Sequence, residues 1–373
     1  MSWNYVTLDK LGSVSRGKSK HRPRNDKSLF GGKYPFIQTA DVKAAGLYLT
    51  EYTETYSDKG LAQSKLWPAG TLCITIAANI ADTTILGIDA CFPDSVMGFV
   101  PYEGVSNVKF VKYAFDILQR DCKKISQGTA QDNLSWKKLS TIKFPAPDIE
   151  VQDRIVNILS VYDDLIENNQ KQIKLLEEAA QRLYKEWFVD LHFQGYEDVK
   201  IVDGVPEGWR KTILESVLEK ITTGLNPRKN FVLGSGSNYY VTIKNMGDNN
   251  IYLDEKCDRV DDEALVKINK RSDLKIGDIL FSGIGTMGRV YLVSVPTDNW
   301  NVSESVFTMR ANEKISKELL YLMLLSSDVQ GYCDTHAHGV AQRGIRMADL
   351  TKVGKLVSWL PRKAAIVSYK PVP

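Results

Sequence analysis

Apolar residues between Val151 and Asp190 recur at alternating steps of four and three positions. This heptad spacing predicts an α-helix with one coiled-coil-type apolar seam, and neither glycine nor proline interrupts it. The apolar seam consists of two rows, Leu159, Ile166, Ile173, Ala180 and Trp187, and Ile155, Tyr162, Asn169, Leu176 and Leu183. At about 1.5 Å per residue the helix would be roughly 60 Å long, more than a globular core needs. The pattern therefore predicts a spacer and a docking surface near the middle of the chain.

The segments on either side of this helix show the mixed pattern of α+β domains. Alternating apolar residues in Thr71–Ile76 predict a strand, and the spacing in Lys112–Lys123 predicts a helix. Two prolines in Phe144–Asp148 end the first segment, and Asp148 is a candidate N-cap for the long helix. The predicted divisions are a first domain at 1–148, the helix at 149–191, a glycine-punctuated linker at 192–208, a second domain at 209–361 and a tail at 362–373.

The sequence from Trp209 onward repeats landmarks of the first segment. The paired stretches are Trp3–Leu8 with Trp209–Leu214, Tyr34–Gln38 with Tyr239–Ile243, and Leu66–Leu72 with Leu274–Leu280. Gly128, Ala130, Gln131 and Leu139 recur as Gly339, Ala341, Gln342 and Leu350, at one offset of 211 positions (339 − 128). The fold class expected is α+β, with two similar globular domains of mixed helices and strands separated by the long helix. Duplicated domains with different surfaces suggest one task performed on two targets.

Composition narrows the class of protein without naming a function. Of the 373 residues, 43% are hydrophobic and 25% charged, as in soluble globular proteins. No apolar run approaches the ~20 residues of a membrane span, and the first ten residues lack a signal-peptide pattern. The five cysteines are scattered without a CxxC pair, so we expect a reducing, cytoplasmic location. Because the net charge is only +3, the placement of charge matters more than its sum.

Two motifs resemble cofactor sites but lack the surroundings those sites need. Gly12–Ser19 matches the phosphate-binding pattern GxxxxGK[ST], yet Pro23 and a run of charges follow where a helix should begin, so we expect a basic loop. Phe281–Gly285 resembles the turn of S-adenosylmethionine-dependent methyltransferases. The chain contains no Asn/Asp-Pro-Pro-aromatic tetrapeptide, so we expect a hairpin turn between strands at Gly277–Phe281 and Arg289–Val293.

No catalytic set emerges from the remaining residues. His336 and His338 have no carboxylate or cysteine at ligand spacing, and Pro147–Glu150 lacks the lysine of a PD-(D/E)xK nuclease. No nucleophile–base pattern is present in the sequence. We therefore expect a protein that recognises a partner without catalysing a reaction, and that needs neither a cofactor nor a metal.

One stretch concentrates positive charge. Between Lys10 and Lys33, here called the basic segment, six further arginines and lysines stand against a single acid, Asp26. Such a density suits contact with phosphates, although a solvated loop would show the same composition. The repeated polar loops around Gln131 and Gln342 suit either base contact or a structural turn. The candidate DNA contacts are Arg16, Lys18, Lys20, Arg22, Arg24, Lys33, Gln131, Arg228, Lys229, Lys244, Arg289, Gln342 and Arg343.

The layout resembles that of the specificity (S) subunits of type I restriction–modification enzymes. The similarity is carried by Phe144–Pro147 leading into Val151–Ile155, by Gln181–Asp190, and by Val205–Trp209. It extends to Gly277–Leu280 and to the repeated Gly/Gln loops, and covers most of the chain. The long helix is its most specific part.

This resemblance implies more than the residues alone predict. Each domain would be a target recognition domain that reads one half of a bipartite sequence in double-stranded DNA. The helix would hold the halves apart and dock the methyltransferase (M) subunit, which methylates adenine N6 and through which the restriction (R) subunit, an ATP-dependent endonuclease, joins the complex. The partner-binding residues would then be Leu159, Ile166, Ile173, Leu176, Leu183 and Trp187.

The chain departs from the family after its second domain. A second conserved helix is expected there, but Leu356–Pro373 contains no heptads beyond Pro361, so we expect a truncated form. Without that partner helix the apolar seam would be exposed, which predicts self-association or poor solubility in the absence of the M subunit. The alternative is a non-enzymatic two-domain coiled-coil adaptor that binds protein rather than DNA, and the basic segment argues against it.

Overall fold

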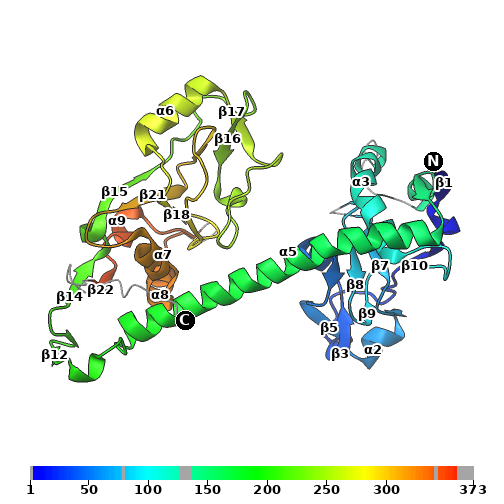
Figure 1. Ribbon diagram of the computed structural model, residues 1–373, viewed down its shortest axis with the longest axis horizontal. Helices are drawn as coiled ribbons and strands as arrows, with labels where there is room; N and C mark the ends of the chain where they lie inside the picture. The colour runs from blue at the N-terminus through cyan, green and yellow to red at the C-terminus, as the bar shows by residue number, and fades with distance from the viewer. Residues whose placement is uncertain (1–2, 78–79, 127–133, 135, 340–342, 359–373) are drawn as a thin grey trace, which may run out of the picture. The chain divides into compact units, whose positions relative to one another are not determined.

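The computed structural model describes residues 3–77, 80–126, 134, 136–339 and 343–358. The chain divides into two compact units, Met1–Lys171 and Gln172–Pro373 (Figure 1). The division falls inside the long helix, so that the first half of this helix belongs to one unit and the second half to the other.

The first unit is built on strands whose buried side chains form three apolar clusters. Its five-stranded sheet has the order β2-β10-β7-β8-β4, and its four-stranded sheet the order β5-β3-β9-β6. These strands are β2 (Gly12–Arg16), β3 (Phe30–Phe36), β4 (Tyr48–Leu49), β5 (Glu54–Tyr56), β6 (Leu66–Trp67), β7 (Leu72–Thr75), β8 (Thr83–Leu86), β9 (Ala90–Cys91) and β10 (Val96–Pro101). β1 (Asn4–Thr7) pairs antiparallel with β11 (Lys143–Ala146), so the start and the end of the domain are neighbours.

Short helices complete the first unit. They are η1 (Leu8–Lys10), η2 (Lys27–Leu29), α1 (Thr39–Ala44), α2 (Asp58–Ala62), α3 (Val108–Ser126) and α4 (Trp136–Leu139). α3 packs on β8, and Phe115 from this helix lies in the core with Leu72, Phe99 and Phe144. The strand predicted at 71–76 and the helix predicted at 112–123 are confirmed as β7 and α3.

The second unit repeats the same kinds of element. Its strands are β12 (Ile201–Val202), β13 (Val205–Pro206), β14 (Arg210–Ile213), β15 (Leu218–Thr223), β16 (Asn238–Val241), β17 (Asp258–Val260), β18 (Ile279–Ser282), β19 (Val290–Leu292), β20 (Trp300–Val302), β21 (Val306–Ala311) and β22 (Gly354–Ser358). Its helices are η4 (Tyr196–Asp198), η5 (Leu214–Val217), η6 (Ile243–Asn245), α6 (Asp262–Ser272), α7 (Lys317–Leu325), α8 (Ser327–Thr335) and α9 (Met347–Leu350). The segment expected to be a linker thus contains η4 and a β12–β13 hairpin.

The strand orders of the two units match, which confirms the predicted duplication. β2-β10-β7-β8 in the first unit corresponds to β15-β21-β18-β19 in the second, and β5-β3-β9 corresponds to β17-β16-β20. β3–β9 and β16–β20 are both parallel pairs, and β14–β22 repeats the β1–β11 pair. Leu134 N–H donates to Ile76 O, and Ile345 N–H donates to Gly283 O. The two donors are 211 positions apart (345 − 134), the offset that the sequence predicted for these loops.

Two of the predicted alignments are displaced by one residue. The Asp41 carboxylate accepts from Gln38 N–H, and the Asn245 side-chain oxygen accepts from Thr242 N–H, so Gln38 corresponds to Thr242 rather than to Ile243. The hydroxyls of Thr75 and Ser282 each accept the N–H that returns across the next hairpin, which aligns Leu72 with Ile279 instead of Leu280. A similar pattern of apolar residues cannot determine the strand register, whereas these side-chain hydrogen bonds do.

The predicted long helix is present as α5 (Ile149–Tyr184), extended by one π-helical turn, η3 (Lys185–Val189). It begins directly after Asp148, whose carbonyl accepts the N–H groups of Val151 and Gln152. The left-handed conformation of Leu191, with φ 63°, then turns the chain away from the helix axis. The observed helix ends two residues before the predicted end at 191.

A buried glutamine fixes the start of α5 to the first unit. Gln152 is 1% exposed, and its Oε1 accepts from Asn107 N–H at 3.0 Å. Its Nε2 donates to Val105 O at 3.0 Å and to Pro147 O at 2.8 Å. Every polar atom of this amide is therefore bonded, as a buried amide requires. Further along α5, Asp163 accepts a hydrogen bond from the hydroxyl of Tyr113 on α3. Burial is the main cause that raises the pKa of Tyr113, and the Asp163 carboxylate raises this pKa further.

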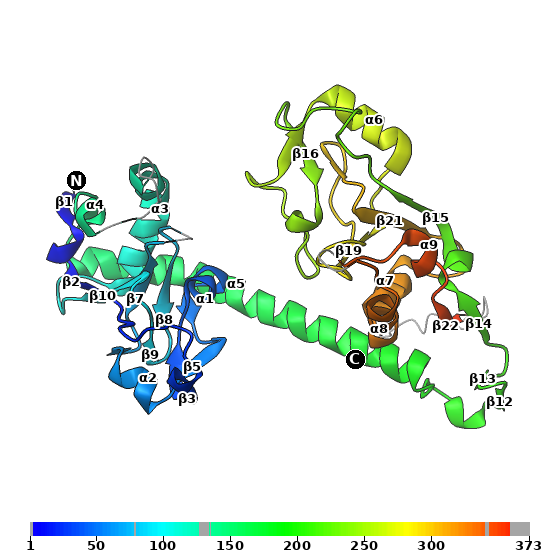
Figure 2. The same cartoon turned by 180° about the vertical axis from the view of Figure 1, so that it is seen from behind.

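The apolar seam of α5 stays exposed within each unit. Val156 is buried against the first unit, but Ile166 is 54% exposed. In the second unit Tyr184 is buried, and α7 and α8 lie beside the second half of α5 in both views (Figures 1 and 2). Leu176, which lines the apolar groove between α5 and α7, is nevertheless 69% exposed. Residues outside the apolar seam, such as Val156 and Tyr184, thus pack against the two units. The described residues leave the seam itself largely uncovered.

We predict that Gln152→Ala destabilises the first unit. The substitution leaves Asn107 N–H and the Val105 and Pro147 carbonyls without their buried partner, at a cost of about 1–3 kcal/mol. The shift in the urea transition of the first unit measures this loss. Gln170→Ala, at an exposed position of the same helix, is the matched control and should change stability by less than about 0.5 kcal/mol. Equal effects of the two substitutions would contradict the role of the buried amide.

Candidate nucleic-acid interface

The basic segment begins as a strand, so the phosphate-binding motif is not formed. Gly12–Arg16, the part of the motif that precedes its second glycine, is β2, and no helix starts between Gly17 and η2 at Lys27. A Cβ at Gly12 would meet Val100 O at 2.3 Å, and a Cβ at Gly17 would meet Phe92 O and Pro93 O at 2.3 Å. The glycines therefore serve close strand packing rather than a phosphate cradle, as the basic-loop prediction required.

The second unit solves the same packing problem with Gly224. This residue follows β15 as Gly17 follows β2, and its N–H donates to Ser303 O at 3.2 Å. A Cβ there would lie 1.6 Å from Val302 O. In both units a glycine thus allows close backbone packing beside β9 or β20. The loop that follows carries more cations in the first unit than in the second.

The predicted DNA contacts of the basic segment separate into two groups. Arg16, Lys18 and Lys20 are exposed, and none of them has a carboxylate partner among the residues that the structure describes. Arg24 pairs with Asp94 at 2.8 Å, and Arg22 Nη1 donates to Ser19 O and His21 O. The first group is available for phosphates, whereas the second partly serves the shape of the loop. Lys33 is also exposed, with its ammonium 5.2 Å from the ring centroid of Tyr34.

Asp26, the one acid of the basic segment, shapes the loop from within. Its carboxylate accepts from Ser28 N–H and the Ser28 hydroxyl, and it lies 2.9 Å from His21 Nε2. The hydrogen bonds from Ser28 are the main cause that holds the pKa of Asp26 well below its usual range. Asp26 therefore remains ionised and keeps the ends of this loop in place.

Sequence reasoning missed Lys65, which joins the basic segment in space. Ser64 Oγ donates to Lys18 O at 2.8 Å, and the Lys65 ammonium lies 3.4 Å from the ring centroid of Trp67. Burial and, second, the positive charge of Lys18 lower the pKa of Lys65. Nothing in the local sequence connects residue 65 with residue 18, because only the fold brings them together.

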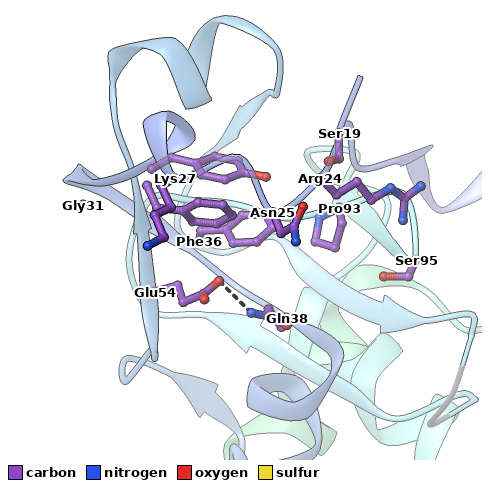
Figure 3. A pocket seen from close by; sticks show the side chains of 12 residues that line it. Ser19, Arg24, Asn25, Lys27, Gly31, Phe36, Gln38, Glu54, Pro93 and Ser95 are labelled. Carbon is purple, nitrogen blue, oxygen red and sulfur yellow. Dashed lines mark hydrogen bonds between the residues drawn. The ribbon is translucent and has the colours of Figure 1, made fainter. Parts of the chain in front are cut away.

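A pocket of about 690 Å³ opens beside the basic segment (Figure 3). We call it the first-unit pocket, and it is lined by Ser19, Arg24, Asn25, Lys27, Phe30, Gly31, Phe36, Gln38, Glu54, Tyr56, Pro93 and Ser95. The rings of Phe36 and Tyr56 stack at a centroid distance of 3.9 Å. Gln38 Nε2 donates to Glu54 Oε2 at 2.7 Å. Cations, an amide–carboxylate pair and aromatic rings thus meet in one place, and the sequence had singled out only Arg24 as a candidate contact.

The candidate contacts of the second unit lie on several loops. Arg228 and Lys229 are exposed after Gly224, and Lys244 is exposed in η6. Arg289 and Arg343 flank the hairpin turn 283–288: the Arg289 guanidinium donates to Met246 O, and Arg343 Nη2 donates to Asp334 O at 2.7 Å. This turn joins the antiparallel strands β18 and β19, which confirms the predicted hairpin.

Several predicted sites receive no further support as chemical centres. Gln131 and Gln342 lie outside the described residues. His336 stacks on Tyr332, and His338 lies 3.4 Å from Asp349. Within the described ranges, no group of three or more His, Cys, Asp or Glu side chains is placed to hold a metal ion. Nor does any described helix combine the length and the apolar character that crossing a bilayer requires.

Comparison with known proteins identifies a family that the first unit and most of α5 resemble. Residues 2–178 match the family described as the type I restriction modification DNA specificity domain. The second unit repeats the strand order of the matched one, so the architecture of the whole chain is similar to that of a specificity subunit with two such domains.

Particular relatives resemble parts of the chain. The specificity subunit of the type I restriction enzyme MjaIX from Methanocaldococcus jannaschii is 27% identical over 254 residues, which cover 65% of this chain and 58% of that one. The EcoR124I/EcoR124II specificity subunit from Escherichia coli is 28% identical over 197 residues, covering 49% and 47%. The chain therefore matches about half the length of these relatives. A crystal structure of the S subunit from M. genitalium has the same fold, with a TM-score of 0.50 at 15% identity over 96% of this chain and 85% of that one.

We predict that Gly17→Ala destabilises the first unit and displaces the basic segment. The added Cβ would overlap two backbone oxygens that cannot move independently of β9, at a cost of about 1–3 kcal/mol. Urea denaturation measures the loss. The control is Gly46→Ala, because a Cβ at Gly46 meets nothing within 4 Å. A loss at Gly46 as large as that at Gly17 would contradict the close-packing explanation.

Proposed function

We propose that this chain is the DNA-recognition subunit of a type I restriction–modification complex, and that each unit reads one half of a bipartite sequence in double-stranded DNA. The observation that carries the proposal is the duplicated strand order with different loops. Two domains with one sheet frame and different polar surfaces suit two different half-sites. Similarity to the specificity-domain family, and the cations of the basic segment that have no carboxylate partner among the described residues, support the same function.

The two units differ in the number of cations that they offer to the DNA backbone. Arg16, Lys18 and Lys20 provide charge without a carboxylate partner among the described residues, which suits binding to the DNA backbone. The candidate residues of the second unit, Arg228, Lys229, Lys244, Arg289 and Arg343, provide fewer cations on any one loop. We therefore expect the first unit to supply the larger part of the salt-dependent affinity.

The α5 helix is proposed to dock the M subunit. Its apolar seam is exposed in the unbound chain, and Leu159, Ile166, Ile173, Leu176 and Leu183 range from 37% to 69% exposed. An apolar stripe of this extent on a helix suits burial against another chain, and a second copy of this chain is the competing occupant. Trp187 is less accessible than these residues, so it contributes at the edge.

In this proposal the chain itself is non-catalytic. The assembled complex would be an adenine-N6 methyltransferase through M and an ATP-dependent endonuclease through R. The alternative function, a two-domain coiled-coil adaptor that binds protein, differs in one measurable property. An adaptor has no affinity for duplex DNA that falls steeply with salt.

We predict that the full chain binds duplex DNA in a salt-dependent manner and that Lys18→Gln/Lys20→Gln weakens this binding. The slope of log K against log salt is negative, and each lost phosphate contact should reduce its magnitude by about 0.9. Fluorescence anisotropy between low and physiological salt measures both quantities. Lys171→Gln is the control, since Lys171 is paired with Glu167 on α5. Binding that is independent of salt would favour the adaptor function.

We predict that Leu176→Asp abolishes or strongly weakens binding of the M subunit while both units remain folded. Leu176 is 69% exposed, so its charge should cost little in the free chain but much in an apolar interface. Co-purification of the two subunits, with thermal unfolding of the free chain, measures the two effects. Lys174→Asp is the control, because Lys174 precedes Leu176 by two residues and therefore lies on the opposite side of α5. Unchanged M binding by Leu176→Asp would contradict docking through the apolar seam.

A further inference from the structure

The side chains of Gln38 and Glu54 form a rigid pair at the first-unit pocket. Gln38 follows the buried end of β3, and its backbone N–H donates to Asp41 Oδ2 at 2.7 Å. Glu54 opens β5 and lies opposite Phe36 in the antiparallel β3–β5 register. Glu54 therefore projects from a paired strand, and Gln38 projects from the N-cap position of α1, two residues after the end of β3. Sites on such elements hold their geometry better than sites on loops.

The hydrogen bond between the two side chains orients the amide. A carboxylate only accepts hydrogen bonds, so the NH₂ group of Gln38 must face Glu54, as the 2.7 Å contact requires. One N–H of Gln38 remains for a ligand. Its carbonyl oxygen accepts from Asp41 N–H in the capping box of α1, and its second lone pair can still accept from a ligand. An adjacent donor and acceptor are what adenine needs at N7 and N6, where glutamine binds in a bidentate manner. Guanine offers two acceptors at this edge, and cytosine offers only a donor.

The surroundings of the pair suit a nucleotide. Figure 3 shows Gln38 and Glu54 at one side of the pocket, with Asn25 and Arg24 across from them. Exposed Lys27 supplies positive charge at the rim for a phosphate, and Arg24 is held there by its ion pair with Asp94. The stacked rings of Phe36 and Tyr56 form an apolar wall. These are the components that base recognition combines: cations for position and an oriented amide for specificity.

The second unit has different chemistry at the equivalent place. Thr242 stands where the first unit has Gln38, and its hydroxyl bonds to the Asn245 side chain within its own turn. Tyr240 corresponds to Phe36, and its hydroxyl donates to Leu225 O at 2.9 Å and lies 3.2 Å from Glu304 Oε2. The shared strand order thus carries an oriented, accessible amide in the first unit only. Such a difference is what two units with different half-sites require.

From these observations we propose that Gln38 reads an adenine of the first half-site at this pocket and that Glu54 acts as a positioning residue for the Gln38 amide. This inference rests on the proposed function, since it assigns one base contact within that DNA-recognition surface. Lys27 at the rim binds a flanking phosphate and carries no base preference.

Selection of bound duplexes from a randomised library by the full chain, followed by sequencing, tests this assignment. The wild-type chain should return a bipartite motif with an adenine at one position of one half. Gln38→Ala should lower the preference for that adenine by about 5- to 150-fold, the range of a lost bidentate base contact. The other half of the motif and the salt slope should not change.

An exchange of the pair provides a gain of function that misfolding cannot imitate. Gln38→Glu/Glu54→Gln keeps the hydrogen bond but reverses its direction, so residue 38 presents only an acceptor to the DNA. The preferred base at the same position should change from adenine to cytosine, whose N4 donates. Glu54→Ala should reduce the adenine preference while the salt slope stays at its wild-type value, an effect that a merely structural role would not produce. Glu51→Ala, at an exposed carboxylate outside the pocket, is the matched control and should retain the wild-type motif.

The outcomes separate the inference from the function on which it rests. If Gln38→Ala and the exchanged pair both return the wild-type motif, the assignment of Gln38 is overturned and DNA recognition by the chain stands. A change confined to the other half of the motif overturns it equally. If the wild-type chain selects no motif and shows no salt-dependent binding, the proposed function fails, and the adenine contact fails with it.

Discussion

The hydrogen bonds of the Gln152 amide determine which side of α5 faces the first unit. Its three hydrogen bonds, made by a side chain that is itself buried, hold the first turn of the helix to the chain before α3 and to Pro147 after β11. Because each helical residue is rotated by a fixed angle from the last, fixing the first turn sets the direction of the helical side chains that follow within the first unit. Val156 and Asp163 consequently face the first unit, and the apolar seam faces elsewhere. Seam exposure is thus a consequence of how the helix begins.

The sheet frames and the loops of this molecule obey different constraints. Gly17 and Gly224 occur at equivalent points because both frames bring two strands too close for a Cβ. The loops that follow have no such restriction, and they differ in length and in charge. Asp26 shows how a loop acquires a defined shape without a core, since its carboxylate is hydrogen-bonded both to Ser28 and to His21. Packing therefore maintains the frame, while polar contacts give each loop its own surface.

Sequence patterns predicted the periodic features of the fold. Heptad spacing identified α5, and the repeat identified the second domain because landmark residues survive in equivalent strands. Side-chain pairing over long distances was not predictable. Nothing near Arg24 indicates that Asp94 will bind it, and nothing near Gln38 indicates that Glu54 will lie on the neighbouring strand. The one-residue displacement of two alignments has the same cause, since strand register depends on partners that the linear sequence does not identify.

The pairing of β1 with β11, and of β14 with β22, has a consequence for how such a protein evolves. In each unit the strand that enters the domain is hydrogen-bonded to the strand that leaves it, from Asn4 beside Ala146 and from Arg210 beside Ser358. A domain with adjacent entry and exit points can be exchanged as a cassette, because the flanking chain continues from the same place whatever lies between. Recombination at these strand pairs would deliver a new surface in one genetic step, with the adjoining helix unaltered.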